Sequence, residues 1–171
     1  IKKHLKLKRC KKMGYTHYWK IKKKPELKDL SGCLENIKKV IAKYMDIIQY
    51  EEDEAKEPIA EKNLIRFNGI GEDGHETFLF EFPISKETLE YQKKQGLDDD
   101  KDYSFFFCKT ARKPYDKAVT RCLLILKEYL KSDMVLESDG SFSDYEEWGE
   151  AIEEVNNMGI NIKMYLMAEE L

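Results

Sequence analysis

The sequence predicts a single α+β domain, a mostly antiparallel sheet of about five strands covered by two to three helices in the order βαβββαβα. Two observations predict this class. Short runs rich in aromatic and β-branched residues alternate with longer runs whose apolar residues recur at helical spacing. The chain also has 171 residues, of which 42% are hydrophobic and 12% aromatic, which is enough for one folded core.

The first half is expected to hold one strand, one helix and a strand pair. THYWKIKK alternates, so residues 15–22 are expected to form a strand, which Pro25 interrupts. Ser31 can then cap a helix over 32–51. NLIRFNG and ETFLFEF are two short strands around a glycine turn. The apolar stripe of the helix consists of Leu34, Ile37, Val40, Ile41, Tyr44, Ile47 and Ile48.

The second half is expected to add two strands and two helices. After Pro83, a polar stretch is predicted to be a surface loop that contains about one helical turn. YSFFFCKT is a nearly continuous apolar strand, which indicates a central place in the sheet. Pro114 then opens a helix, DMVLES is a strand, residues 143–156 form an acidic helix, and INIKMYLMAEEL is a last strand or packing segment. The buried face of the Pro114 helix consists of Tyr115, Ala118, Val119, Cys122, Leu123, Leu126 and Leu130.

Charge is distributed unevenly along the chain. Residues 1–12 carry seven Lys or Arg and no acid, which leaves 23 basic and 33 acidic side chains elsewhere, a balance of about −10. Met13 opens MGYTHYWKI, which is typical of a natural start. We therefore treat residues 1–12 as a basic N-terminal extension of doubtful origin and residues 13–171 as the domain. The acidic body argues against non-specific nucleic-acid binding except through residues 1–12.

The composition favours a cytoplasmic protein. No apolar run reaches the roughly 20 residues that a membrane-spanning helix needs, so no membrane is expected. The cysteines have no C-x-x-C spacing and no nearby histidine, which favours buried thiols over disulfides or zinc. They are Cys10, Cys33, Cys108 and Cys122.

Gly69, Gly71 and Gly74 have the spacing G-x-G-x-x-G. A dinucleotide fingerprint requires a helix after such glycines, but HETFLFEF is a strand, so the sequence predicts a hairpin turn. Its polar residues are weak candidates for a divalent metal, because neighbouring strand residues point to opposite faces. These candidates are Glu72, Asp73, His75 and Glu76. HET also matches one half of a two-histidine phosphoesterase motif whose second half is absent.

The most informative stretch is FFFCKTARKPYDKAV. Here a buried strand ends, a short loop holds Lys109, Thr110, Arg112 and Lys113, and a helix begins. Cations at a helix N-terminus can hold a phosphate or carboxylate, although a solvated basic loop has the same composition. Tyr15, Tyr18, Trp19 and Trp148 could stack on a base, but core positions are the commoner use of such residues.

Three motifs, GYTHYW, IRFNGIGEDGHETF and FFFCKTARKPYDKAV, are specific as a set. On these the chain resembles a family of small uncharacterised proteins encoded by bacteriophages and prophages, over most of residues 13–139. The resemblance implies a protein acting in the cytoplasm of an infected bacterium and transfers no catalytic residue. Its motif positions are candidates for a shared site: His17, Arg66, Asn68, Glu72, Asp73, His75, Glu76, Lys109, Thr110, Arg112, Lys113, Tyr115 and Asp116.

We therefore expect a binding protein without turnover or cofactor, which holds a phosphate-bearing, nucleotide-like ligand and by analogy counteracts host defence. The 109–113 loop would form one wall of the site, and His17, Arg66 and His75 the other. One alternative is an acidic inhibitor of a host protein, suggested by residues 51–57 and 143–156. A second is a phosphoesterase or metal-dependent nuclease that uses His75. A homo-oligomer of identical chains is also compatible with the sequence.

Overall fold

The computed structural model describes residues 14–51, 56–97 and 100–162, and these form an α+β fold, as predicted. The strands are β1 (Thr16–Lys22), β2 (Ile48–Gln49), β3 (Ile59–Ala60), β4 (Leu64–Gly69), β5 (Phe78–Glu81), β6 (Tyr103–Lys109) and β7 (Met134–Ser138). The helices are α1 (Ser31–Lys43), α2 (Lys86–Lys94), α3 (Asp116–Leu130) and α4 (Glu150–Asn157).

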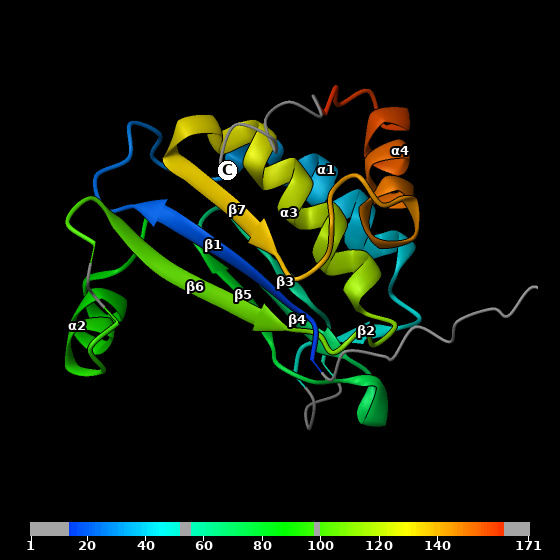
Figure 1. Cartoon of the computed structure of the whole chain (residues 1–171), viewed down its shortest axis with the longest axis horizontal. Coiled ribbons are helices and arrows are strands. Elements are labelled where there is room, and N and C mark those ends of the chain that lie inside the picture. Colours follow the sequence, from blue (N-terminus) through cyan, green and yellow to red (C-terminus); the bar gives the residue numbers. More distant parts are fainter. Residues whose placement is uncertain (1–13, 52–55, 98–99, 163–171) are drawn as a thin grey trace, which may run out of the picture.

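The strands form two antiparallel sheets. In the first, β1 lies between β6 and β7, with Trp19 opposite both Phe106 and Leu136. In the second, β4 pairs with β2, β3 and β5. Figure 1 shows the first sheet in front of α3, while α2 stands apart at the far end of the sheet. The two sheets meet at Glu76, whose backbone N–H donates to the Lys109 carbonyl at 3.3 Å.

The core is built around α3. Eleven of its 15 residues are buried, because β7, α1 and α4 all pack against it. This explains why the buried residues at its centre, 122–126, are apolar without a break rather than along one stripe. Trp19, Phe78 and Phe80 of the two sheets pack against one another with ring centroids 5.6–6.4 Å apart.

The first helix is shorter than predicted. It ends at Lys43 instead of residue 51, and the Tyr44 N–H closes it on the carbonyls of Val40 and Ile41. Ile48, which continues the helical apolar spacing, lies in β2 and pairs with Gly69. Here the backbone hydrogen bonds to β4 favour a strand over continuation of the helix. Because β4 is distant in the chain, the local apolar pattern could not predict this.

The polar stretch after Pro83 contains more helix than predicted. α2 runs for nine residues, and the hydroxyl of Ser85 accepts a hydrogen bond from the Thr88 N–H at 3.2 Å, as a helix cap does. The predicted 143–156 helix is divided into a π-helical turn, Tyr145–Gly149, and α4. The segment INIKMYLMAEEL lies outside the described residues from position 163 onward.

The apolar run in β6 does not mark a central strand. In its sheet β6 is at the edge and β1 is central. Phe106 faces inward toward Trp19, with ring centroids 6.2 Å apart, whereas Phe107 is 49% exposed. The prediction failed because three successive phenylalanines conceal which alternate positions face the core.

The thiol prediction is confirmed for the described residues. Cys33, Cys108 and Cys122 are free and buried, and burial raises the pKa of each thiol. Cys10 lies outside the described residues. None of the helices in the described part of the chain is long and apolar enough to cross a membrane.

Glu154 joins three helices. Its carboxylate accepts hydrogen bonds from the Tyr44 hydroxyl at 2.8 Å and from Arg121 Nε at 3.1 Å, and it lies 2.8 Å from Lys43 Nζ. Burial opposes ionisation, but the contacts with Lys43, Tyr44 and Arg121 outweigh it and lower the pKa of Glu154. The carboxylate is therefore bound in its charged form.

This gives a pH prediction. A lowered folded-state pKa stabilises the fold above the ordinary value of 4.5, and that stabilisation disappears as pH falls through the folded-state pKa. We expect Glu154→Gln to cost on the order of 1–3 kcal/mol near pH 7 and to reduce the loss of stability below pH 4.5. Urea unfolding at several pH values measures both, with the exposed Glu35→Gln as control. Parallel pH profiles for wild type and Glu154→Gln would contradict the assignment.

Candidate functional site

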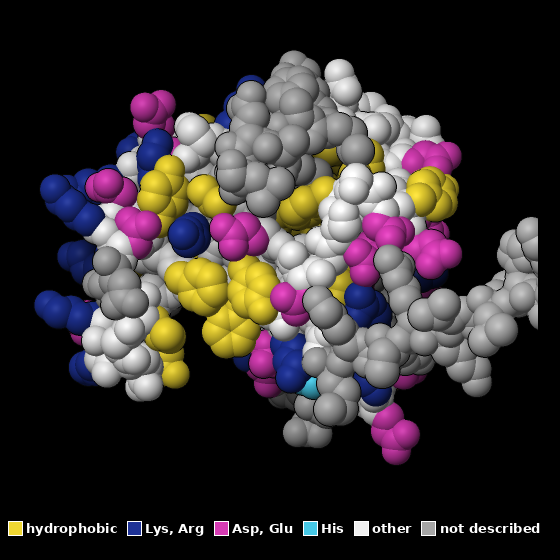
Figure 2. All heavy atoms as spheres, viewed as in Figure 1, with side chains coloured by type: hydrophobic (Ala, Val, Ile, Leu, Met, Phe, Trp, Pro, Cys, Tyr) yellow, Lys and Arg dark blue, Asp and Glu magenta, His cyan; other side chains and the backbone are white. Residues whose placement is uncertain are grey.

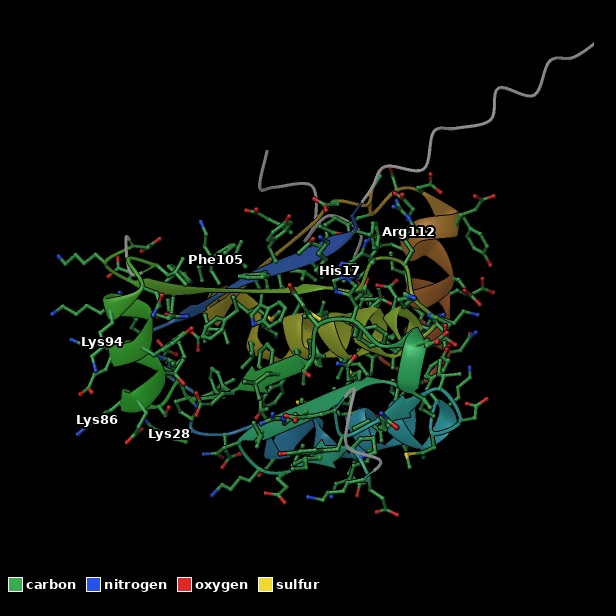
Figure 3. The ribbon with its side chains drawn as sticks, turned by 90° about the horizontal axis from the view of Figure 1, so that it is seen from below. His17, Lys28, Lys86, Lys94, Phe105 and Arg112 are labelled. Atoms are coloured by element: carbon green, nitrogen blue, oxygen red, sulfur yellow. The ribbon has the colours of Figure 1, made fainter. Side chains whose placement is uncertain are left out.

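The motif FFFCKTARKPYDKAV contacts each of the other two sequence motifs through hydrogen bonds. His17 of β1 pairs with Cys108 of β6, and Lys113 Nζ donates to the carbonyl of Glu72 at 2.8 Å. Figure 3 shows His17 and Arg112 at the same end of the molecule, opposite α2. The fold thus gathers most of the predicted site residues, although it uses many of their polar groups internally.

His17 lies inside this end of the molecule. The residue is 0% exposed and lies edge-on to the rings of Tyr15 and Trp148. Its Nε2 is 2.7 Å from Asp116 Oδ1 and its Nδ1 is 3.0 Å from Ser138 Oγ. Both ring nitrogens therefore have partners within the protein.

The Ser138 hydroxyl fixes the direction of these hydrogen bonds. It accepts from the Gly140 N–H at 3.0 Å and from Trp148 Nε1 at 3.3 Å, which fills both oxygen lone pairs. Its own proton is then directed to His17 Nδ1, and His17 Nε2–H donates to Asp116. Ser138, His17 and Asp116 are connected in the same way as the residues of a hydrolase triad. However, both lone pairs of the serine oxygen are occupied and His17 is fully buried, so the three side chains form a structural network.

The start of α3 offers no free amides. The N–H groups of Asp116, Lys117 and Ala118 donate to the carbonyls of residues 113–115 at 2.9–3.2 Å. Asp116 itself is the anion in the first turn, and it also accepts from the buried hydroxyl of Thr110 at 2.6 Å. An anion at this end would therefore have to be bound by side chains.

The 109–113 loop has an unusual backbone. Ala111 and Arg112 have φ values of 52° and 58°, a left-handed conformation that costs non-glycine residues on the order of 1 kcal/mol each. The Thr110 and Ala111 N–H groups both donate to the Tyr15 carbonyl at 3.0 Å, which holds this conformation. As a result Arg112 lies over the Tyr15 ring, 3.9 Å from its centroid, and bonds Glu147 at 2.8 Å.

Arg66 is held at a different place. Its guanidinium lies 4.8 Å from the ring centroid of Tyr50 and forms an ion pair with Glu51. No hydrogen bond or ion pair links it to the 109–113 loop within the described ranges. Its predicted place in the second wall of the site therefore has no support from its contacts.

The glycine pattern forms a hairpin turn, as predicted. β4 and β5 pair on either side of it, and a 3₁₀ turn, Gly71–Asp73, lies between them. Asn68 braces the turn: its Oδ1 accepts from the N–H groups of Gly69 and His75, and its Nδ2 donates to the His75 carbonyl at 3.0 Å. The side chain of His75 is exposed.

The weak metal candidates do not converge. Glu76 accepts from the Lys109 N–H at 2.7 Å, whereas Glu72 and Asp73 lie on the 3₁₀ turn. Among the residues that the structure describes, no group of three or more His, Cys, Asp or Glu side chains is placed to hold a metal ion.

A cavity of about 210 Å³ lies where the 109–113 loop and the start of α3 face the 145–150 segment. We call it the α3 cavity. Four cations and four carboxylates line it: Arg112, Lys113, Lys117 and Arg121, with Asp116, Glu146, Glu147 and Glu150. Within the described part of the chain, two buried groups of its lining residues have no hydrogen-bond partner: the Tyr15 hydroxyl and Arg121 Nη2, which lies 3.5 Å from Glu150. Burial, then the charge of Asp116, raises the pKa of Tyr15 to about 12, so it keeps its proton.

The cavity includes two residues that the sequence prediction missed, Lys117 and Arg121, and also Tyr15, for which the sequence left a core position and a stacking role open. Arg121 carried a signal, because it interrupts the apolar run AVTRCLLIL and a buried arginine needs a partner. Comparison with known proteins adds no further assignment: no family model, no curated protein and no solved structure matches the chain.

Proposed function

We propose that the protein binds a small phosphate-bearing molecule in the α3 cavity. The observation that carries the proposal is the pair of unused donors. Arg121 is 3% exposed and Tyr15 is 2% exposed, yet among the described residues neither the Tyr15 hydroxyl nor Arg121 Nη2, which lies 3.5 Å from a Glu150 carboxylate oxygen, has a hydrogen-bond partner. Buried donors that are left unpaired are costly, and an acceptor-rich ligand would remove that cost.

The charges around the cavity indicate which end of a ligand it fits. Lys117 is exposed and has no partner within the described part of the chain, so it is free to approach a phosphate. Glu146 and Glu150 line the same space, and their carboxylates can accept hydrogen bonds from the hydroxyl groups of a ligand. A sugar phosphate presents both kinds of group.

The volume sets a size limit. Pockets for whole ligands usually measure about 300–1,000 Å³, and the α3 cavity, at about 210 Å³, is smaller. The sugar-phosphate end of a mononucleotide fits this limit, with its base outside. In an infected bacterium, the setting implied by the phage resemblance, such binding would withdraw a nucleotide from use.

Calorimetric titration with adenosine monophosphate and with adenosine tests the proposal. We expect the phosphate to be required, and Lys117→Ala to weaken binding about tenfold through the loss of one charge-assisted contact. The matched control is Lys28→Ala, because Lys28 is also exposed and lies at the opposite end of the molecule (Figure 3). Equal binding of the nucleoside, or no effect of Lys117→Ala, would overturn the proposal.

The acidic inhibitor is the second candidate. The observation in its favour is the series of carboxylates along the 145–157 segment, where Glu146, Glu150 and Glu153 follow one another at helical spacing. Charge reversal at Glu146 and Glu153 should then abolish capture of a basic partner protein. The calorimetric titration of Lys117→Ala tests nucleotide binding separately.

A further inference from the structure

An aromatic face on the first sheet is separate from the α3 cavity. Residues of β1 alternate, with His17, Trp19 and Ile21 inside and Tyr18 and Lys20 on the outer side. On β6 the register places Phe107 opposite Tyr18 and Phe105 opposite Lys20. We call Tyr18, Phe105 and Phe107 the aromatic face. Figure 2 shows hydrophobic side chains gathered beside a cation in the middle of the molecule.

The rings of this face follow one another. Tyr18 and Phe105 are stacked with centroids 6.0 Å apart and an interplanar angle of 23°. Phe105 and Phe107 are 6.1 Å apart at 34°. Phe107 is half-exposed, and the hydroxyl of Tyr18 is held by Asp139 at 3.3 Å. Tyr18 and Phe105 are partly buried, so the face presents part of each of its three rings to solvent.

The exposed area of the face indicates whether it binds a second copy of this chain or a small partner that stacks on the rings. An aromatic side chain has about 150–250 Å² of surface, so three partly buried rings leave on the order of 200 Å² exposed. A stable protein interface needs about 800 Å² per partner. The outer edge of β6 is also partly occupied, because Gln92 Nε2 donates to the Phe105 carbonyl at 2.8 Å. The face is therefore too small for a dimer and is suited to flat rings.

The charges around the face are mixed, with one lysine at one end. Lys20 is paired with Phe105 in the strand register, whereas α2, with Lys86 and Lys94, is at the same end of the molecule as Phe105 but on the other side of β6 (Figure 3). The carboxylates Glu137 and Asp139 border the Tyr18 end. A phosphate backbone crossing the face would meet attraction at the Lys20 end and repulsion at the Tyr18 end.

From this juxtaposition we propose that the aromatic face binds single-stranded nucleic acid by stacking two or three bases. Base–aromatic stacking is sequence-tolerant, and three partly exposed rings in series on an antiparallel sheet offer faces on which bases can stack. Because a single lysine lies within the face and the body is acidic, the affinity comes chiefly from the bases. It therefore depends only weakly on salt.

Fluorescence anisotropy of the full chain with a labelled oligothymidylate of about ten nucleotides tests this, beside an abasic oligomer of the same length. We expect the abasic oligomer, which keeps the phosphates, to bind much more weakly. Phe107→Ala should weaken thymidylate binding about tenfold. The control is Tyr145→Ala, since Tyr145 is 62% exposed on a different element, and circular dichroism verifies that both variants fold.

Three outcomes would overturn the proposal. Equal binding of the abasic oligomer would assign binding to cations, including those of residues 1–12. Unchanged thymidylate binding by Phe107→Ala would exclude the aromatic face. Absence of binding, together with self-association that Phe107→Ala abolishes, would make the face a contact between copies of this chain.

Discussion

Asp116→Ala is expected to destabilise the fold by about 3–5 kcal/mol. The carboxylate accepts from His17 Nε2 at 2.7 Å and from Thr110 Oγ1 at 2.6 Å, and both donors belong to residues that are 0% exposed. Alanine leaves each donor buried without an acceptor. A loss of this size is a large share of the 5–15 kcal/mol that holds a typical domain together.

Urea unfolding followed by tryptophan fluorescence measures this loss, because Trp148 packs on His17. We expect a lower midpoint with an unchanged slope. Asp116→Asn keeps one side-chain oxygen as an acceptor and should lose less. Asp73→Ala is the control, since Asp73 is exposed on the 3₁₀ turn, and it should stay within about 0.5 kcal/mol of wild type. A wild-type midpoint for Asp116→Ala would show that the buried network contributes nothing.

Gly69→Ala is expected to cost about 2–4 kcal/mol. A Cβ atom at this position would lie 2.2 Å from the backbone carbonyl oxygen of Asp73 and 2.7 Å from its carbon. Backbone atoms inside a braced turn cannot move aside as a flexible side chain can. The hairpin would have to open, and the Asn68 hydrogen bonds to His75 would be lost with it.

Gly71 provides the matched comparison within the same loop. Its φ is +52°, but a Cβ there would have nothing within 4 Å. Gly71→Ala should cost only about 1 kcal/mol, and Gly71→Asn less, since asparagine tolerates the left-handed region. Thermal unfolding of the three variants gives the order. If Gly71→Ala proves more damaging than Gly69→Ala, backbone conformation and not close packing limits this turn.

The glycine pattern also illustrates how far sequence reasoning reaches. HETFLFEF after the glycines was enough to predict a hairpin and to set aside the dinucleotide fingerprint, and β4 and β5 confirm the hairpin. The sequence could not show that Gly69, with an ordinary φ, is the position with no room for a side chain. That depends on how the loop folds back on Asp73.

The candidate site was predictable only in part. KTARKPYD pointed to the loop that lines the α3 cavity, because cations before a helix have a local signature. The sequence did not reveal that His17 and Thr110 are consumed by Asp116, nor that Arg66 lies beside Tyr50. The partners of His17 are 99 and 121 residues away along the chain, so their meeting depends on which strands pair.

By itself the sequence determined the class of fold and the predicted buried face of α3, because apolar periodicity is a local property that burial enforces. Only the tertiary structure decided that Ile48 joins a strand, that β6 is an edge strand and that Phe107 faces solvent. These outcomes depend on hydrogen-bond partners distant in the chain, and a local pattern carries no information about them.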